Sequence, residues 1–173
     1  MSHQMLVVPN FKCEVTMKDF PSVDEDYKLW VLLNQAADTT LRARQKELDK
    51  YGISTAEAAV LFAVQAIGER ATPAEITRWL LREPHTVTEI LHRMEKGGLV
   101  TKTKDLEKKN MVRVSITEKG RQAYEQSTKR KSIHKVMSAL SKEERQQLGS
   151  YLEILRNKAL GELTEERPKP PFP

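Results

Sequence analysis

The chain has 173 residues, of which 39% are hydrophobic and 31% charged, which suits one globular domain with much solvated helix surface. It has no run of about 18 apolar residues and no N-terminal signal-peptide pattern, so we expect a cytoplasmic protein without a membrane span. The single cysteine, Cys13, excludes an internal disulfide and a Cys-rich zinc site.

The sequence carries no catalytic motif. It has no Gly-rich phosphate loop, no H-E-x-x-H and no G-x-S-x-G, and its four histidines lie at positions 3, 85, 92 and 134. His85 and His92 share a helical face, but their spacing corresponds to about 10 Å, too far for one metal ion. We therefore expect no enzyme, no cofactor and no metal site.

The first predicted helix covers residues 24–50 and follows an N-terminal extension at 1–23. A capping box of Ser22 and Glu25 introduces the helix, and Tyr51-Gly52 ends it. Its apolar stripe consists of Leu29, Leu32, Leu33, Ala36, Leu41 and Leu48.

Two shorter helices are predicted next. A second capping box, Ser54 with Glu57, opens a helix that ends near Gly68. The apolar residues expected in its core are Ala59, Val60, Phe62, Ala63 and Ile67. Thr72 then caps a helix that starts with Pro73. Its inward stripe is Ile76, Trp79 and Leu80.

The fourth predicted helix begins at Pro84 and ends at Gly97-Gly98. Its buried stripe is Val87, Ile90, Leu91 and Met94. Its opposite face carries His85, Thr88, Glu89, His92 and Arg93. Residues 99–104 and 111–117 alternate apolar and polar positions, as two β-strands around a charged tip at 105–110.

This order of elements predicts a winged helix-turn-helix. In that fold a recognition helix enters the major groove of DNA, and a basic hairpin, the wing, follows the phosphates or enters the minor groove. We refer to the predicted winged helix-turn-helix region, residues 52–120, as the reader.

Two more helices are predicted after the wing. Thr117 is expected to cap a helix that runs to about Leu140, and Ser141 with Glu144 to cap the last one. The apolar residues of the last helix are Leu148, Tyr151, Leu152, Leu155 and Leu160. Residues 164–173 hold four of the eight prolines and are expected to form a disordered tail.

The fold class is therefore mainly α with a small β-wing, in which helices at 24–51 and 121–163 flank the reader. These flanking helices carry apolar stripes that a small monomer would struggle to cover, so we expect them to form a homodimer. A two-fold dimer places two recognition helices in successive major grooves, which predicts an inverted-repeat operator in double-stranded DNA with half-sites about 10 bp apart. The alternative is a monomer with all stripes folded inward.

Positive charge is concentrated on the wing and the helix after it. Residues 102–135 hold eleven Lys and Arg against four Asp and Glu, a net +7, whereas the whole chain is +5. This clustering favours contact with phosphates. Two alternatives remain, a winged helix that docks onto another protein and a nucleoid-type binder without sequence preference.

Several runs of residues carry a family resemblance. Thr86-Val87-Thr88 precedes RMEKGGLV at 93–100, and VSITEKG follows at 114–120. These runs resemble the motifs of the MarR family of bacterial transcription regulators, and the similarity extends over about residues 27–160.

The resemblance implies a dimeric regulator, most often a repressor, whose DNA affinity changes when a small and often phenolic molecule binds. The positions that we expect to contact DNA are Thr72, Pro84, His85, Thr86, Thr88, Glu89, Arg93, Lys102, Lys108, Lys109 and Arg113.

The chain departs from the family pattern at two of these places. The wing tip reads Lys108-Lys109-Asn110 where relatives commonly have Asp-Arg-Arg, so we expect phosphate affinity rather than A·T selectivity there, and the loss of a local ion pair. Glu89 stands where many relatives carry Arg. It either pairs with Arg93, the interpretation we favour, or accepts a hydrogen bond from cytosine N4.

A ligand pocket is expected between the dimer helices and the reader, with plain core packing as the alternative. Its predicted residues are Trp30, Leu33, Asn34, Ala37, Phe62, His134 and Met137. Peroxide-sensing relatives place a reactive cysteine near the position of Trp30, whereas Cys13 lies well before it, with Lys12 and Lys18 as its basic neighbours. A redox response through Cys13 is thus a further alternative to ligand binding.

Overall fold

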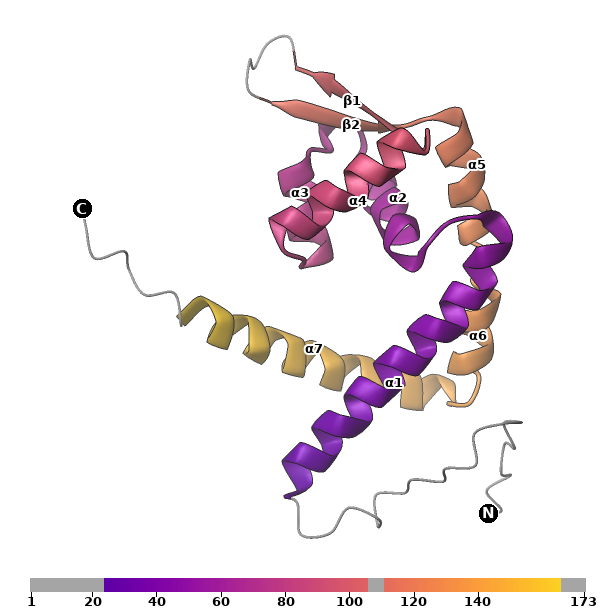
Figure 1. The fold of residues 1–173 in the computed structure, drawn as a ribbon. Helices are drawn as coiled ribbons and strands as arrows, with labels where there is room; N and C mark the ends of the chain where they lie inside the picture. Colours follow the sequence, from indigo (N-terminus) through magenta and orange to yellow (C-terminus); the bar gives the residue numbers. More distant parts are fainter. Residues whose placement is uncertain (1–23, 106–110, 166–173) are drawn as a thin grey trace, which may run out of the picture. The chain divides into compact units, whose positions relative to one another are not determined.

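The computed structural model describes residues 24–105 and 111–165 (Figure 1). Its elements in chain order are α1 (Glu25–Leu48), η2 (Asp49–Tyr51), α2 (Thr55–Ile67), η3 (Gly68–Arg70), α3 (Pro73–Leu80), α4 (Pro84–Lys96), β1 (Val100–Lys104), β2 (Val112–Ile116), α5 (Glu118–Ser127), α6 (Lys131–Met137) and α7 (Lys142–Glu165). Cys13, Ser22, Lys108, Lys109, Asn110 and the tail from residue 166 lie outside the described residues. The chain divides into two compact units, Met1–Arg42 and Ala43–Pro173, and α1 runs across their boundary.

The predicted caps of α2, α3 and α5 are confirmed. Ser54 and Glu57 form a complete capping box at α2, and the Thr72 hydroxyl accepts a hydrogen bond from the Glu75 amide at 3.2 Å at α3. Thr117 accepts from the Gly120 amide at 3.0 Å and so starts α5. At α1, where the described chain begins, the carboxylate of Asp24 accepts from the Tyr27 amide at 2.8 Å.

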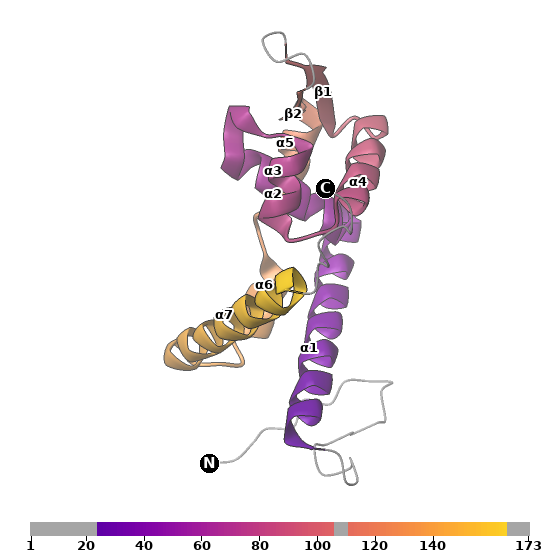
Figure 2. The same ribbon diagram turned by 90° about the vertical axis from the view of Figure 1, so that its left-hand side faces the viewer.

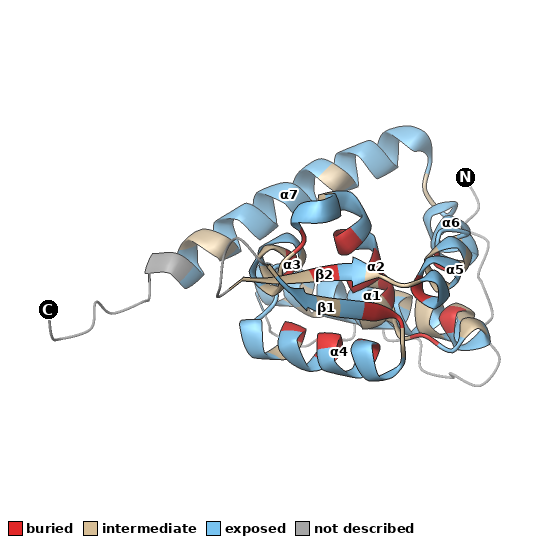
Figure 3. Cartoon of the chain, turned by 90° about the horizontal axis from the view of Figure 1, so that it is seen from above, coloured by how far each residue is buried: buried red, intermediate tan, exposed pale blue. Residues whose placement is uncertain are grey.

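The hydrophobic core lies almost wholly within the reader. The completely buried side chains include Leu61 of α2, Ile76 of α3, and Leu91 and Met94 of α4. Val114 of the wing belongs to the same buried cluster. Figure 3 shows these elements carrying the buried positions, whereas α7 is exposed along nearly its whole described length. The mainly α winged-helix fold predicted from the sequence is thus confirmed.

The wing is a two-stranded antiparallel sheet in which Val100 pairs with Ile116 and Lys104 with Val112. It lies across one end of the cluster formed by α2, α3 and α4 (Figures 1 and 2). The Val114 amide also donates to the Ala71 carbonyl at 2.9 Å, which ties β2 to the turn before α3.

A close backbone approach fixes the root of the wing. A Cβ on Gly120 would lie 2.0 Å from the Leu99 carbonyl oxygen, so only glycine fits there. The Thr117 amide donates to that same carbonyl at 3.1 Å. The backbone at the start of the wing and the first turn of α5 therefore lie too close together for a side chain at position 120.

Two aromatic side chains that were predicted to pack inward are exposed. Phe62 is 39% exposed and Trp79 is 47% exposed, and their rings pack edge to face at 5.3 Å. The Arg130 guanidinium lies 5.5 Å from the centre of the Phe62 ring. The prediction for Trp79 is wrong because α3 is short and buries Ile76 alone before Leu81 ends it with φ 51°.

The single helix predicted from Thr117 to about Leu140 is also wrong, because the structure has two helices there. Arg130 adopts φ 47° between α5 and α6, a left-handed conformation that breaks a helix. No proline or glycine marks this break. The side chains that bind both ends of this break lie far away in the sequence, on the last turns of α1.

Arg44 and Glu47 bind the two helix ends at the break between α5 and α6. Arg44 donates to the Ser127 carbonyl at the end of α5, and Glu47 accepts from the Lys131 and Ser132 amides at 2.9 Å at the start of α6. Arg44 and Glu47 also pair with each other at 2.8 Å, with side chains only 12% and 10% exposed. Burial raises the pKa of Glu47, but hydrogen bonds from Ser132, Lys131 and Arg44 outweigh it and bring the pKa from 4.5 to about 2.

Most side chains of helix α7 are exposed to solvent. Tyr151 is 55% exposed and Leu155 54%, although both belong to the predicted apolar stripe. It extends to Glu165, two residues into the segment that was predicted to be disordered. No single helix in the described part of the chain is long and apolar enough to cross a membrane, although Glu25–Tyr51 and Thr55–Arg70 pass that test when taken together across a break.

Candidate nucleic-acid interface

The recognition helix α4 presents one buried and one exposed face. Val87, Ile90, Leu91 and Met94 anchor the helix in the core. The opposite face is solvent-exposed, and the Thr88 hydroxyl donates back to the Pro84 carbonyl at 2.9 Å within the first turn. Because the anchoring residues are rigidly packed, the exposed side chains project from a fixed surface.

An open cavity of about 480 Å³ lies between this face and the wing, and we call it the reading groove. The residues that line it are Thr88, Glu89, His92, Arg93 and Lys102. Four of them were expected DNA contacts. His92 was not, although its spacing of four from Thr88 and three from Glu89 places it on the same helical stripe.

The other expected contacts divide by position. Pro84 and His85 are exposed at the start of α4, and Thr86 is half-buried beside them. Thr72 is committed to the cap of α3, so its hydroxyl serves the backbone. Lys108 and Lys109 lie outside the described residues.

Two basic residues of the wing are already paired within the chain. Lys102 lies 3.0 Å from the Glu95 carboxylate, and Arg113 lies 2.9 Å from that of Asp105. The second pair gives the wing a local ion pair, which the altered tip sequence was expected to remove. Because their charges are partly neutralised, Lys102 and Arg113 attract phosphate less than free cations would.

The favoured ion pair between Glu89 and Arg93 is not formed. In the part of the chain that the structure describes, neither side chain takes part in an ion pair, although both are exposed on α4. The reading groove therefore presents a separate carboxylate and a separate guanidinium, with the His92 imidazole beside them.

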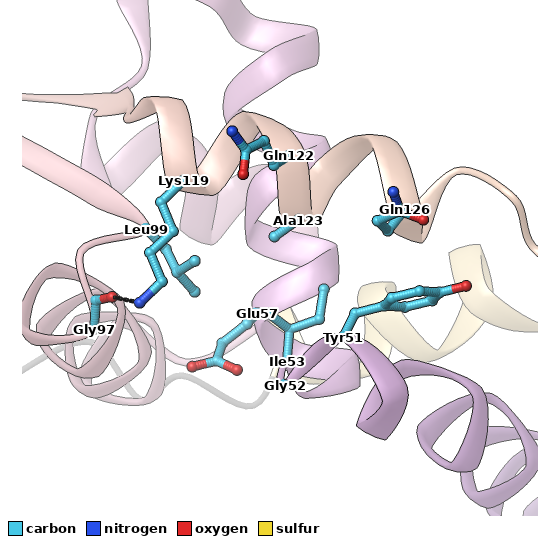
Figure 4. Close-up of a pocket in the computed structure, with 10 residues that line it drawn as sticks. All are labelled: Tyr51, Gly52, Ile53, Glu57, Gly97, Leu99, Lys119, Gln122, Ala123 and Gln126. Carbon is cyan, nitrogen blue, oxygen red and sulfur yellow. Dashed lines mark hydrogen bonds between the residues drawn. The ribbon is translucent and has the colours of Figure 1, made fainter.

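The far end of α4 is fastened to α5. Lys119 donates to the Gly97 carbonyl at 2.8 Å (Figure 4). Thr117 donates to the Gly98 carbonyl at 2.6 Å. A second open cavity, of about 420 Å³, borders this junction. Its lining residues are Tyr51, Gly52, Ile53, Glu57, Gly97, Leu99, Lys119, Gln122, Ala123 and Gln126.

The residues predicted for a ligand pocket are exposed in the single chain. Trp30, Leu33, Asn34 and Ala37 lie along α1 in the unit that ends at Arg42, and the ring of Trp30 stacks on Tyr27 at 5.6 Å. In the other unit, Phe62, His134 and Met137 are also exposed. Neither of the two cavities described above includes any of the seven, so this pocket stays a prediction.

Comparisons with known proteins agree with this geometry. Residues 53–120 match the family model described as a winged helix DNA-binding domain. A search of curated protein sequences found no match.

Among solved structures, the ligand-free organohalide-sensing transcriptional regulator RdhR is 32% identical, with a TM-score of 0.78 over 95% of this chain and 97% of that one. The same regulator bound to 2,4-dichlorophenol aligns equally well, over 96% of this chain and 99% of its own. A MarR mutant from E. coli in complex with operator DNA shares the fold at 22% identity, with a TM-score of 0.71 over 76% of this chain and 95% of that one.

Proposed function

The chain belongs to the MarR family of winged-helix transcription regulators, and from that premise we propose that it is a homodimeric repressor of an inverted-repeat operator, released by a small aromatic ligand. The observation that carries the DNA-binding part is the reading groove. It combines an exposed recognition face on α4, whose Arg93 forms no ion pair with any described residue, and the adjoining wing. The contacts proposed are the expected residues of α4 and the wing, together with His92.

The dimer is supported by apolar side chains that are exposed in the described part of the chain. On α7, Leu148, Tyr151, Leu152 and Leu155 recur at helical spacing and are all exposed. On α1, Leu29, Leu33 and other apolar residues are exposed as well. We propose that 24–51 and 121–163 are dimerisation helices, since a second copy of the chain would bury these stripes.

Light scattering on the full-length protein tests this assembly. At micromolar concentration we expect a species of twice the monomer mass that persists on dilution to nanomolar protein. A monomer under the same conditions would contradict the dimer, and with it the prediction of half-sites about one helical turn apart.

The ligand part rests on the relative that was solved with 2,4-dichlorophenol and shares 32% identity over nearly its full length. We propose that this chain responds to a phenol of that kind, halogenated or plain. The proposed pocket is the predicted set, in which Trp30 and Phe62 supply aromatic surface and Asn34 and His134 supply polar groups.

Fluorescence anisotropy with a duplex selected from a random library tests the response. Addition of 2,4-dichlorophenol should raise the Kd for this duplex by about tenfold, within the usual range of allosteric coupling. Cyclohexanol serves as the non-aromatic control and should have no effect. An unchanged Kd, together with unshifted melting temperatures across a panel of halogenated and plain phenols, would contradict the ligand part while leaving DNA binding intact.

Variants then locate the ligand. Trp30→Ala and Phe62→Ala should abolish the response to the phenol and keep the ligand-free Kd within about twofold. Ile154→Ala is the matched control, since Ile154 is exposed but is not a predicted pocket residue. Unaltered responses in both aromatic variants would remove the proposed pocket.

A further inference from the structure

One carboxylate of the reading groove, that of Glu89, has no partner among the residues that the structure describes. Two other acids of this region are neutralised, Glu95 by Lys102 at 3.0 Å and Asp105 by Arg113 at 2.9 Å. The Glu89 side chain, in contrast, is exposed and makes neither an ion pair nor a hydrogen bond with any described residue.

Arg93 could pair with Glu89 but does not. Arg93 is four residues further along α4, a spacing that favours Glu–Arg pairs on a helix surface, and it lines the same groove. Because the two remain apart, Glu89 offers acceptors only and Arg93 offers donors only, side by side on the exposed face of the recognition helix.

An unpaired carboxylate is unfavourable against a nucleic acid unless it finds a donor. The phosphates repel it, and in the major groove the available donors are the exocyclic amino groups of cytosine and adenine. Adenine presents its amino group beside the N7 acceptor, which suits Asn or Gln better than a carboxylate. Cytosine presents N4 as a donor alone, which suits Glu.

We propose that Glu89 determines sequence specificity by accepting a hydrogen bond from N4 of one cytosine in each operator half-site. Arg93 in turn donates to O6 and N7 of a guanine. Four residues advance about 6 Å along a helix, which corresponds to about two base-pair steps of 3.4 Å each. The cytosine and guanine contacts therefore lie about two base pairs apart when the helix follows the groove.

The same carboxylate suppresses binding to the wrong DNA. Where no cytosine amino group meets it, Glu89 faces phosphate and base acceptors and lowers the affinity. Its removal should therefore tighten binding to random DNA and, at the same time, reduce discrimination at one position. A residue that acted only as a surface charge would produce the first effect without the second.

The experiment selects duplexes from a randomised library with full-length wild-type protein and with Glu89→Gln. Gln keeps an acceptor and gains a donor, so it matches adenine. Glu95→Gln is the matched control, because it removes an equal charge from the same helix and frees Lys102 without altering the Glu89 position. Equal melting temperatures would show that all three proteins are folded.

This inference rests on the proposed function, and the wild-type selection separates the two. Wild type should enrich an inverted repeat with a cytosine in each half-site, Glu89→Gln should move the preference at that position toward adenine by about tenfold, and Glu95→Gln should keep the cytosine. Enrichment of the same cytosine by Glu89→Gln would overturn the inference alone. A wild-type protein that enriches no sequence would overturn the proposed function, and the role of Glu89 with it.

Discussion

The reader and the helices α1 and α7 differ in where their apolar side chains find partners. Every residue of the described hydrophobic core except Leu48 lies between Ile53 and Val114, within the reader. On α7, apolar residues of equal size stay exposed. The reader buries its own apolar side chains, whereas we propose that a second copy of the chain covers those of α1 and α7.

The largest expected effect comes from adding one methyl group within the reader, at Gly120. Gly120→Ala would place a Cβ 2.0 Å from the Leu99 carbonyl and 2.9 Å from an Ile116 methyl, so the root of the wing must move. We expect a loss of about 3 kcal/mol or more in the free energy of unfolding, measured by urea denaturation.

Gly149→Ala on α7 is the matched control for that substitution. Its Cβ would meet nothing within 4 Å, and alanine favours a helix, so we expect a gain of up to about 1 kcal/mol. Equal destabilisation by the two substitutions would contradict the contrast between a tightly packed reader and an uncovered α7.

A second prediction tests what covers α7. The double substitution Leu152→Glu and Leu155→Glu should produce a monomer in light scattering, with helix content retained by circular dichroism. Because a monomer grips one half-site, affinity for the selected operator should fall by about 10²-fold. Ile154→Glu lies off this stripe and should remain dimeric. A double variant that stays dimeric would refute the proposed role of α7.

The third prediction concerns the joint between α5 and α6. The folded-state pKa of Glu47 is about 2 against 4.5, so its stabilisation is fully present above pH 4.5 and is lost as the pH falls toward 2. Glu47→Gln should cost about 2 kcal/mol at pH 7, a difference from wild type that shrinks across that window.

Glu162→Gln provides the control on α7, where the acid pairs with Lys158 on an exposed surface. It should change the free energy of unfolding by less than about 0.5 kcal/mol at any pH. If the difference between Glu47→Gln and wild type were independent of pH between 2 and 7, the low pKa would be wrong.

The smallest expected effect lies within the reader. Lys102 is already paired with Glu95, so Lys102→Ala should weaken binding to operator and random DNA equally, by about threefold or less. Arg93→Ala should instead cost about tenfold on the operator and relax its preference at one position. Anisotropy titrations on both duplexes distinguish the two, and a base-specific loss in Lys102→Ala would contradict the phosphate role.

The local signals in the sequence predicted the fold well. The caps at Ser54, Thr72 and Thr117 and the strand alternation depend on residues close in the chain, and all of them are confirmed. The break at Arg130 could not be read in this way, because it depends on Arg44 and Glu47, more than eighty residues earlier.

The sequence predicted which residues form the exposed face of α4, but not how their side chains pair. Helical periodicity identified the exposed face of α4, but the rotamers that leave Glu89 and Arg93 unpaired depend on the surroundings of each side chain. The pairing of Lys102 with Glu95 joins a strand to a helix and has no signature in sequence spacing. The predicted ligand pocket draws residues from both compact units, Met1–Arg42 and Ala43–Pro173, and stays a prediction.

We propose above all that this chain reads DNA sequence through α4. The most direct measurement is anisotropy of the wild-type protein on its selected duplex and on a scrambled duplex of equal length, across a series of salt concentrations. We predict an affinity ratio of about 10³ or more, with a steep salt dependence on both duplexes. Equal affinity for the two duplexes at every salt concentration would contradict the account.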